Sequence, residues 1–205
     1  MKLEKLRLRS SLFMAMVAMG LFISMQAGAA VVWDEQINGD LSGDYQNPTV
    51  LTLNVGDNHI IFDTVDTDLE YFTFNVAAGF GLSSVVVDDF VSTLTTELAF
   101  LAVATGTAFP TPSNAVDPTT LLGWVHFGLD DLDDDILLTM GDGLGALGFN
   151  GPLGTGDYTF WAQENGSNSD HVDLNFVLSV IPEPSSLALA VVGLLALGRR
   201  KRRTA

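Results

Sequence analysis

The chain has 205 residues, 47 % of them hydrophobic and none of them cysteine, and its formal net charge is −16. All nine basic residues lie near the two ends, and no Lys or Arg stands between Ser10 and Gly198. This distribution excludes a nucleic-acid-binding domain and a phosphate-binding loop in the centre, and the lack of Cys excludes disulfides and thiolate-ligated metals. The hydrophobic content is too high for a disordered acidic segment, so we expect a folded centre with an acidic surface.

Residues 1–29 have the pattern of a secretory signal peptide. An apolar run from Leu12 to Ile23 is followed by small residues, with Ala27 and Ala29 in an A-x-A cleavage signal. Basic side chains precede the run at Lys2, Lys5, Arg7 and Arg9. The sequence therefore predicts a signal helix, export by the Sec machinery and cleavage after Ala29; an uncleaved anchor helix is the alternative.

Residues 30–181 form one predicted domain rich in short β-strands. Phe72, Phe74 and Val76 fall on one face of their run, and every second residue from Val172 to Val180 is apolar. Such a period of two is typical of an antiparallel sheet with one packed face. The expected strands are 50–55, 59–62, 71–76, 82–87, 97–104, 123–127, 158–162 and 172–180. They predict an all-β fold, an antiparallel two-sheet sandwich that is jelly-roll-like.

The segment Asp66–Gly79, DTDLEYFTFNVAAG, resembles a strand of the bacterial pre-peptidase C-terminal β-sandwich domains, and Gly154–Trp161, GTGDYTFW, resembles a later one. The resemblance implies a jelly-roll module of binding or structural type, and some members of that family bind calcium or polysaccharide. A different element is expected at 140–156, where seven glycines predict a mobile surface loop.

Three acidic clusters are candidate metal sites. The densest consists of Asp130, Asp131, Asp133, Asp134 and Asp135. Calcium binds six to eight oxygen ligands and suits such a cluster, although the EF-hand spacing is absent; a solvated acidic loop is the alternative. Asp63, Asp66, Asp68 and Glu70 form a second cluster, in which alternation would bring the last three together, and Asp88-Asp89 is a third.

The sequence predicts no catalytic residues and therefore no enzyme. Nucleophile-elbow, zinc-protease and dinucleotide-binding motifs are absent, and His59, His126 and His171 lack metal-ligand spacing. A carboxylate pair of glycosidase type stays open as an alternative. Aromatic side chains that would stack on sugars if exposed are Trp33, Tyr45, Tyr71, Trp124, Tyr158 and Trp161.

The last 24 residues contain three features in a fixed order. Pro182-Glu183-Pro184 must be extended, and an apolar run follows from Leu187 to Gly198. A helix of a dozen residues spans roughly 18 Å, which is short against a hydrocarbon core of about 30 Å. The chain then ends in a basic cluster of Arg199, Arg200, Lys201, Arg202 and Arg203. This cluster would stay on the cytoplasmic side and stop transfer at the inner membrane.

This order closely resembles the PEP-CTERM sorting signal of bacterial surface proteins. In that family the tail is read by an exosortase, which cuts near the Pro-Glu-Pro and releases the passenger to the outer surface or the polysaccharide matrix. The resemblance implies an inner-membrane-anchored precursor and then a protein of the cell surface or extracellular matrix of a Gram-negative-type bacterium.

We therefore expect a non-catalytic exported β-sandwich, with a signal peptide at 1–29, an acidic domain at 30–181 and a sorting signal at 182–205. The expected partners are exosortase, the Sec machinery, the inner membrane and an exopolysaccharide, with no nucleic acid. A calcium-dependent carbohydrate-binding module is the alternative, and a secreted hydrolase is a more distant one. Because the crowded carboxylates have no basic partners, we also expect raised pKa values in the folded state.

Overall fold

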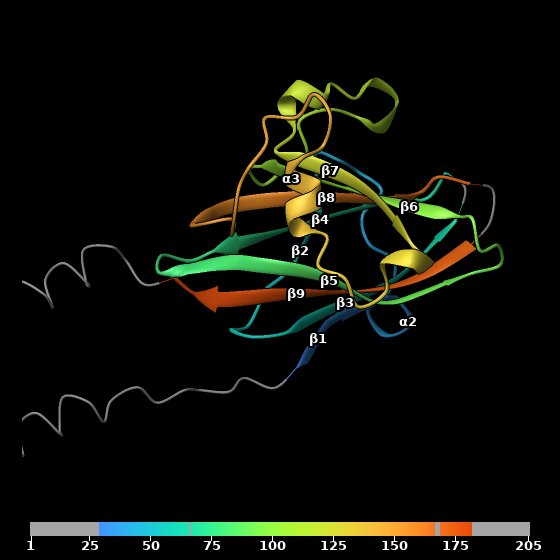
Figure 1. The fold of residues 1–205 in the computed structure, drawn as a ribbon, viewed down its shortest axis with the longest axis horizontal. Coiled ribbons are helices and arrows are strands. Elements are labelled where there is room, and N and C mark those ends of the chain that lie inside the picture. Colours follow the sequence, from blue (N-terminus) through green and yellow to red (C-terminus); the bar gives the residue numbers. More distant parts are fainter. Residues whose placement is uncertain (1–28, 66, 167–168, 182–205) are drawn as a thin grey trace, which may run out of the picture.

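The computed structural model describes residues 29–65, 67–166 and 169–181 (Figure 1). These residues comprise almost all of the predicted acidic domain. The predicted signal helix and the predicted apolar helix at 187–198 lie outside the described residues, as do Pro182, Glu183, Pro184 and the basic cluster.

The described residues fold into two packed sheets (Figure 1). The four-stranded sheet has the order β1 (Ala30–Asp34), β3 (Asn58–Val65), β9 (Ser169–Val180), β5 (Phe80–Ser92). The five-stranded sheet has the order β2 (Thr49–Val50), β4 (Leu69–Val76), β8 (Gly156–Glu164), β6 (Leu98–Thr105), β7 (Gly123–Gly128). The short helices are α2 (Glu35–Asn38), η1 (Ser113–Ala115), η2 (Pro118–Thr120), η3 (Leu129–Asp131) and α3 (Leu137–Gly141). The predicted two-sheet sandwich is confirmed.

The pairing differs from the prediction at the two outer strands. β1 pairs with β3 and β2 pairs with β4 in parallel, whereas all other neighbours are antiparallel. Both sheets are therefore mixed. The reason is that the chain alternates between the sheets from β1 to β5, so that β1 and β3 are not joined by a hairpin. The predicted strand 50–55 is wrong beyond Val50, and β1 was not predicted.

The core between the sheets is built from alternating side chains. Phe72, Phe74 and Phe160 of the five-stranded sheet contact Phe176 of the four-stranded sheet, and all four are at most 2 % exposed. The Phe176 ring lies edge-on to these three rings, with centroid distances of 5.1–5.8 Å. Edge-to-face contacts of this kind add to the free energy gained from burial. The centre of the sandwich is therefore an aromatic cluster shared by both sheets.

The edge strand β5 contains two β-bulges, between Leu82 and Ser84 and between Val87 and Asp89. The second bulge leaves both Asp88 and Asp89 exposed before Phe90 returns to the core. A bulge shifts the alternation of a strand by one residue and turns a side chain to the other face. The outer face of the four-stranded sheet thereby gains an extra carboxylate.

Helix α3 closes the sandwich at one edge, where it contacts both β5 and β7 (Figure 1). Its residues Leu137, Met140 and Gly141 are buried. A Cβ at Gly141 would lie 2.4 Å from the carbonyl oxygen of Phe149, so only glycine fits there. The prediction of a surface loop at 140–156 is therefore wrong at both ends. Met140 and Gly141 belong to α3, where the glycine permits close packing, and Gly156 is the first residue of β8.

Replacement of Phe176 by Ala should lower the free energy of unfolding by about 3–5 kcal/mol, because it leaves a cavity among three aromatic rings. Phe176→Leu, which keeps most of the volume, should cost much less. Chemical denaturation of both variants measures the difference. Equal losses in the two variants would contradict the packing described for this cluster.

Candidate functional site

The core becomes acidic at one end of the sandwich. The inward positions of β4, β8 and β9 are apolar until the end of each strand, where Glu70, Glu164 and Asp170 occupy them; β3 has Thr64 at the corresponding place. Thr64, Glu70 and Asp170 are 0 % exposed and Glu164 is 6 % exposed. Asp170 lies opposite Thr64 in the register of β3 and β9. We call these four residues the acidic end of the core.

Most side-chain oxygens of the acidic end receive no hydrogen bond from a backbone or neutral side-chain donor in the described part of the chain. Both carboxylate oxygens of Glu70 and of Asp170 are buried without such a partner, and so are Oε2 of Glu164 and Oγ1 of Thr64. A buried polar group without a partner costs about 1–3 kcal/mol, and a buried charge costs more. The carboxylate oxygens must therefore be neutralised by protons or by a bound cation.

Glu70 is the centre of a group of carboxylates that we call the Glu70 cluster: Glu35, Asp40, Asp68 and Glu70. Single ligand oxygens of Glu35, Asp40 and Glu70 lie within 4.8 Å of one another. Glu35, the first residue of α2, is fixed in place because its Oε1 accepts a hydrogen bond from Leu41 N (3.0 Å) and its Oε2 from Asp63 N (2.8 Å). Carboxyl groups from α2, from the segment after it and from β4 thus meet at the buried side chain of Glu70.

Burial and mutual repulsion raise the pKa values in this cluster. Burial is the largest cause for Glu70, and the charges of Glu35, Asp68 and Asp40 add to it, so that the pKa of Glu70 rises to about 10. Burial likewise raises the pKa of Glu35 and the pKa of Asp68. Without a bound cation, the Glu70 carboxyl is therefore protonated at neutral pH.

Glu164 and Asp170 form a pair of acids at the acidic end of the core. Burial, followed by contact with Asp170, raises the pKa of Glu164 to about 7. Oε1 of Glu164 accepts a hydrogen bond from Gly166 N at 2.7 Å. The Glu164 carboxyl therefore keeps its proton up to about neutral pH. The expectation of raised pKa values is thus confirmed at these buried acids, whereas local hydrogen bonds lower the pKa of Asp44 and the pKa of Asp117.

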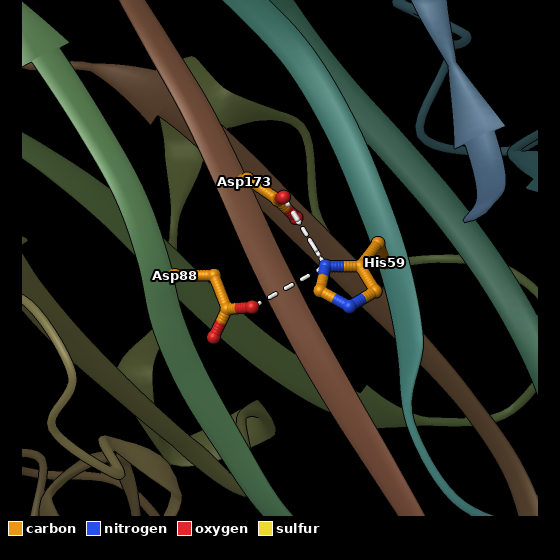
Figure 2. Close-up of side chains that lie close together, drawn as sticks. All are labelled: His59, Asp88 and Asp173. Carbon is orange, nitrogen blue, oxygen red and sulfur yellow. Dashed lines mark hydrogen bonds and ion pairs between the residues drawn. The ribbon is translucent and has the colours of Figure 1, made fainter. Parts of the chain in front are cut away.

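A different group lies on the outer face of the four-stranded sheet (Figure 2). His59 Nδ1 is 3.1 Å from Asp173 Oδ1 and 3.4 Å from Asp88 Oδ2, with the three side chains coming from β3, β9 and β5. The ligand atoms of this group also lie within 4.8 Å of one another. All three side chains have a partner within the group, because His59 Nδ1 lies close to a carboxylate oxygen of each aspartate. Its geometry is therefore explained as an ion-pair network.

The five aspartates predicted to hold calcium are not gathered into one site. Their backbone lies along β5, with Ile136 N bonded to Val85 O and Asp133 N bonded to Val87 O. Two side chains accept backbone hydrogen bonds: Asp131 from Gly128 N, and Asp135 from Val85 N and Leu137 N. Asp130, Asp133 and Asp134 are exposed. The segment thus acts as an edge cover for β5, and calcium binding there stays a prediction.

The second predicted cluster is brought together only in part. Asp68 and Glu70 belong to the Glu70 cluster, but Asp63 pairs with His171 on the next strand, and Asp66 is outside the described residues. Glu35, Asp40, Glu164 and Asp170 were not predicted. A signal for Glu70 was present in the sequence, because it has the same parity as Phe72 and Phe74 and therefore faces the core.

The outer face of the five-stranded sheet has an aromatic groove of about 300 Å³. Its lining residues are Phe100, Val116, Pro118, Leu121, Trp124, His126, Trp161, Gln163 and Asn165. Of the aromatic residues predicted as sugar platforms, Trp124 is half-buried in this groove, and Trp161 also lines it but is only 3 % exposed. Tyr71 and Tyr158 are buried, which excludes them as exposed platforms.

The raised pKa values make stability depend on pH. A carboxyl with an ordinary pKa of 4.5 in the unfolded chain and a higher pKa in the fold keeps its proton longer when folded, so stability falls as pH rises through that interval. In chelator, the melting temperature should fall by roughly 5 °C or more between pH 5 and pH 8. The Glu70→Gln variant should show a smaller fall and a higher melting temperature at pH 8, while the exposed Asp142→Asn should not. A flat profile for the unsubstituted protein would contradict the account.

Comparison with known proteins gives one match. Residues 180–203 match the PEP-CTERM protein-sorting motif, whereas no curated protein and no solved structure matches the chain. None of the helices in the described residues is long and apolar enough to cross a membrane. The resemblance to pre-peptidase C-terminal domains stays a prediction. The chain carries the tail of an exported protein that is anchored in the membrane, processed by exosortase and sorted to the surface.

Proposed function

We propose that the sandwich is a non-catalytic surface module that binds a divalent cation, calcium, at the Glu70 cluster, and that this cation holds the N-terminal segment to the core. The observation that carries the proposal is Glu70 itself. It is 0 % exposed, and in the described part of the chain its oxygens have no hydrogen-bond partner other than neighbouring carboxyl groups. Ligand oxygens of Glu35 and Asp40 lie within 4.8 Å of it.

The ligand chemistry favours calcium. All side-chain donors in the cluster are carboxylate oxygens, which are the ligands of hard cations. Calcium tolerates irregular geometry and a coordination number of 6–8, so four carboxylates and water would complete its shell. Magnesium requires near-ideal octahedral geometry, and zinc prefers nitrogen or sulfur ligands.

A cation here would join parts of the domain that are distant in sequence. Glu35 follows β1 and also bonds to β3 through Asp63 N, while Glu70 belongs to β4 in the other sheet. A bound ion would therefore link both sheets and α2. Because Ser10–Gly198 has no Lys or Arg, a metal ion is the available counter-charge for these acids, and extracellular modules typically bind calcium with a Kd of roughly 10⁻⁴–10⁻³ M.

The sorting tail indicates the cellular location at which this module would act. Exosortase processing near Pro182-Glu183-Pro184 would release it from the basic cluster at Arg199–Arg203, and the sandwich with its carboxylates would remain at the surface or in the matrix. The passenger sequence has no nucleophile–base motif, which supports a binding or structural role.

Replacement of Pro182 and Pro184 by Ala should block processing, since the two prolines are the residues of the motif that prevent a helical backbone, and Ala permits one. The double variant should accumulate as an uncleaved form in the inner-membrane fraction, detected by mass and by fractionation. Substitution of Ser185 and Ser186 by Ala, which leaves the motif intact, is the control. Normal surface release of the double variant would contradict the role of the motif.

Calcium should raise the melting temperature of the full chain, measured by calorimetry at pH 7 after removal of metals by chelator. At a calcium concentration tenfold above Kd the gain is roughly 1.4 kcal/mol, or a few degrees for a domain of this size. Glu70→Gln should abolish the shift while the protein stays folded, because the amide removes the charge but keeps the shape.

The acidic loop provides the matched control for this experiment. Asp133→Asn/Asp134→Asn removes two exposed carboxylates far along the chain from Glu70 and should leave the calcium shift intact. If the shift is lost in this double variant and kept in Glu70→Gln, calcium binds at the loop and the proposed site is wrong. If calcium shifts neither the parent nor any variant, the cation role is wrong altogether.

A further inference from the structure

The aromatic groove on the outer face of the five-stranded sheet is separate from the Glu70 cluster. It lies over a second buried apolar cluster on that face, to which Ala102, Leu121 and Trp161 belong. Phe100 of β6, Trp124 and His126 of β7, and Trp161 and Gln163 of β8 line it. The inward face of the same strands already forms the aliphatic and aromatic core. The groove is therefore a second apolar surface, on the side of the sheet that faces away from the core.

The strand register determines the shape of this surface. Ala102 of β6 pairs with Trp124 on one side and with Trp161 on the other, so a small side chain stands between two indoles. In the next pair of positions, Phe100 stands between His126 and Gln163. Ala102 itself is buried, and Phe100 and Trp124 are the aromatic residues that remain accessible in the groove. Residues Val116, Pro118 and Leu121 of the β6–β7 connection bound it.

The rings are held in place by contacts with one another and with the neighbouring loop. Phe100 lies 4.8 Å from Trp161 and 6.1 Å from Trp124 between ring centroids. Trp124 Nε1 donates a hydrogen bond to Leu144 O at 3.2 Å. The aromatic walls are therefore fixed by the fold, and a ligand would not have to order them.

The polar groups around the groove are uncharged. Gln163 and Asn165 provide amides, and burial lowers the pKa of His126, so that its imidazole is neutral at neutral pH. Trp161 Nε1, which lines the same groove, has no acceptor within the described residues. No carboxylate lines the groove. Aromatic walls with a few amide and imidazole groups are typical of sites that orient an uncharged polar ligand.

Two adjoining hollows extend this surface. One shares Gln163 with the groove and is bounded by Asp68 and Glu164; the other shares His126 and Asn165 and is bounded by Glu97. The extended surface offers space beyond the 300 Å³ of the groove itself. A linear ligand of several similar units fits this row of three hollows better than a single small molecule does.

We propose that the groove binds a neutral polysaccharide, with one sugar ring packed on the accessible faces of Phe100 and Trp124 and its hydroxyl groups bonded to Gln163, Asn165 and His126. The apolar faces of a sugar ring pack on aromatic rings, while its hydroxyls need both donors and acceptors, and the groove supplies both. The domain's 23 carboxylates and its lack of Lys and Arg exclude an anionic polymer by charge repulsion.

The test is isothermal titration calorimetry of the full chain, in calcium and in a detergent without a sugar head group. The probes are cellohexaose, maltohexaose and mannohexaose, with oligogalacturonate as the anionic control. At least one neutral probe should bind with a Kd below about 1 mM, and the anionic one should not bind. The neutral oligosaccharide should be recovered intact.

Three variants locate the site. Trp124→Ala and Gln163→Ala should each weaken binding about tenfold or more, while Trp33→Ala, which removes an indole from β1 in the other sheet, should leave the affinity unchanged. A melting curve of each variant confirms that it is folded. Glu70→Gln should bind sugar normally, which separates failure of this inference from failure of the cation site.

Three results would overturn the proposal. The first is the absence of binding to all three neutral probes by the folded parent protein. The second is unchanged affinity in both groove variants. The third is binding of an uncharged alkyl compound, such as dodecanol, by a parent protein that binds none of the sugars. That result would assign the groove to an apolar ligand.

Discussion

The whole structure depends on one electrostatic constraint: a domain with 23 carboxylates has no Lys or Arg to neutralise them. Most of these acids are tolerated because water and salt screen exposed charges. The buried ones cannot be screened in this way. Glu70, Glu164 and Asp170 face the interior, and each must hold a proton, share one or bind a cation.

The buried acids lie together at one end of the core of the sandwich. Phenylalanines from both sheets fill the centre, and the same inward alternation that buries them carries on to Glu70, Glu164 and Asp170. An apolar side chain at these positions would be the simpler choice for stability alone. The acids are therefore best understood as groups that serve a ligand, and the raised pKa of Glu70 describes the domain when that ligand is absent.

Strand alternation made much of this fold predictable. The run from Tyr71 to Val76 and the run from Val172 to Val180 are strands in the predicted register, because one face of each had to be buried. The sequence did not reveal that β1 and β2 pair in parallel, since pairing between distant strands leaves no local pattern. The bulge before Asp89 was equally invisible, as the phase of a strand shifts there only to suit its neighbours.

The candidate site was predictable only in part, for a related reason. Density of acids along the sequence pointed to Asp130–Asp135, yet those residues are local neighbours that mostly face water or cap backbone groups. The Glu70 cluster instead joins acids from α2, the start of β4 and the segment between α2 and β2, which only the folded chain brings together. Burial, not the density of acids along the sequence, distinguishes the Glu70 cluster from Asp130–Asp135. The position of Glu70 on the same strand face as Phe72 was the single sequence feature that indicated this burial.

In the proposed cation site, the Glu70 carboxyl exchanges its proton for a divalent cation. Infrared difference spectroscopy of the full chain at pH 7, before and after addition of calcium, measures this directly, because protonated and ionised carboxyl groups absorb at separate frequencies. The account predicts that a protonated carboxyl band disappears on addition of calcium, that a metal-bound carboxylate band replaces it, and that Glu70→Gln shows neither change. A calcium-independent spectrum, or an identical change in Glu70→Gln, would contradict it.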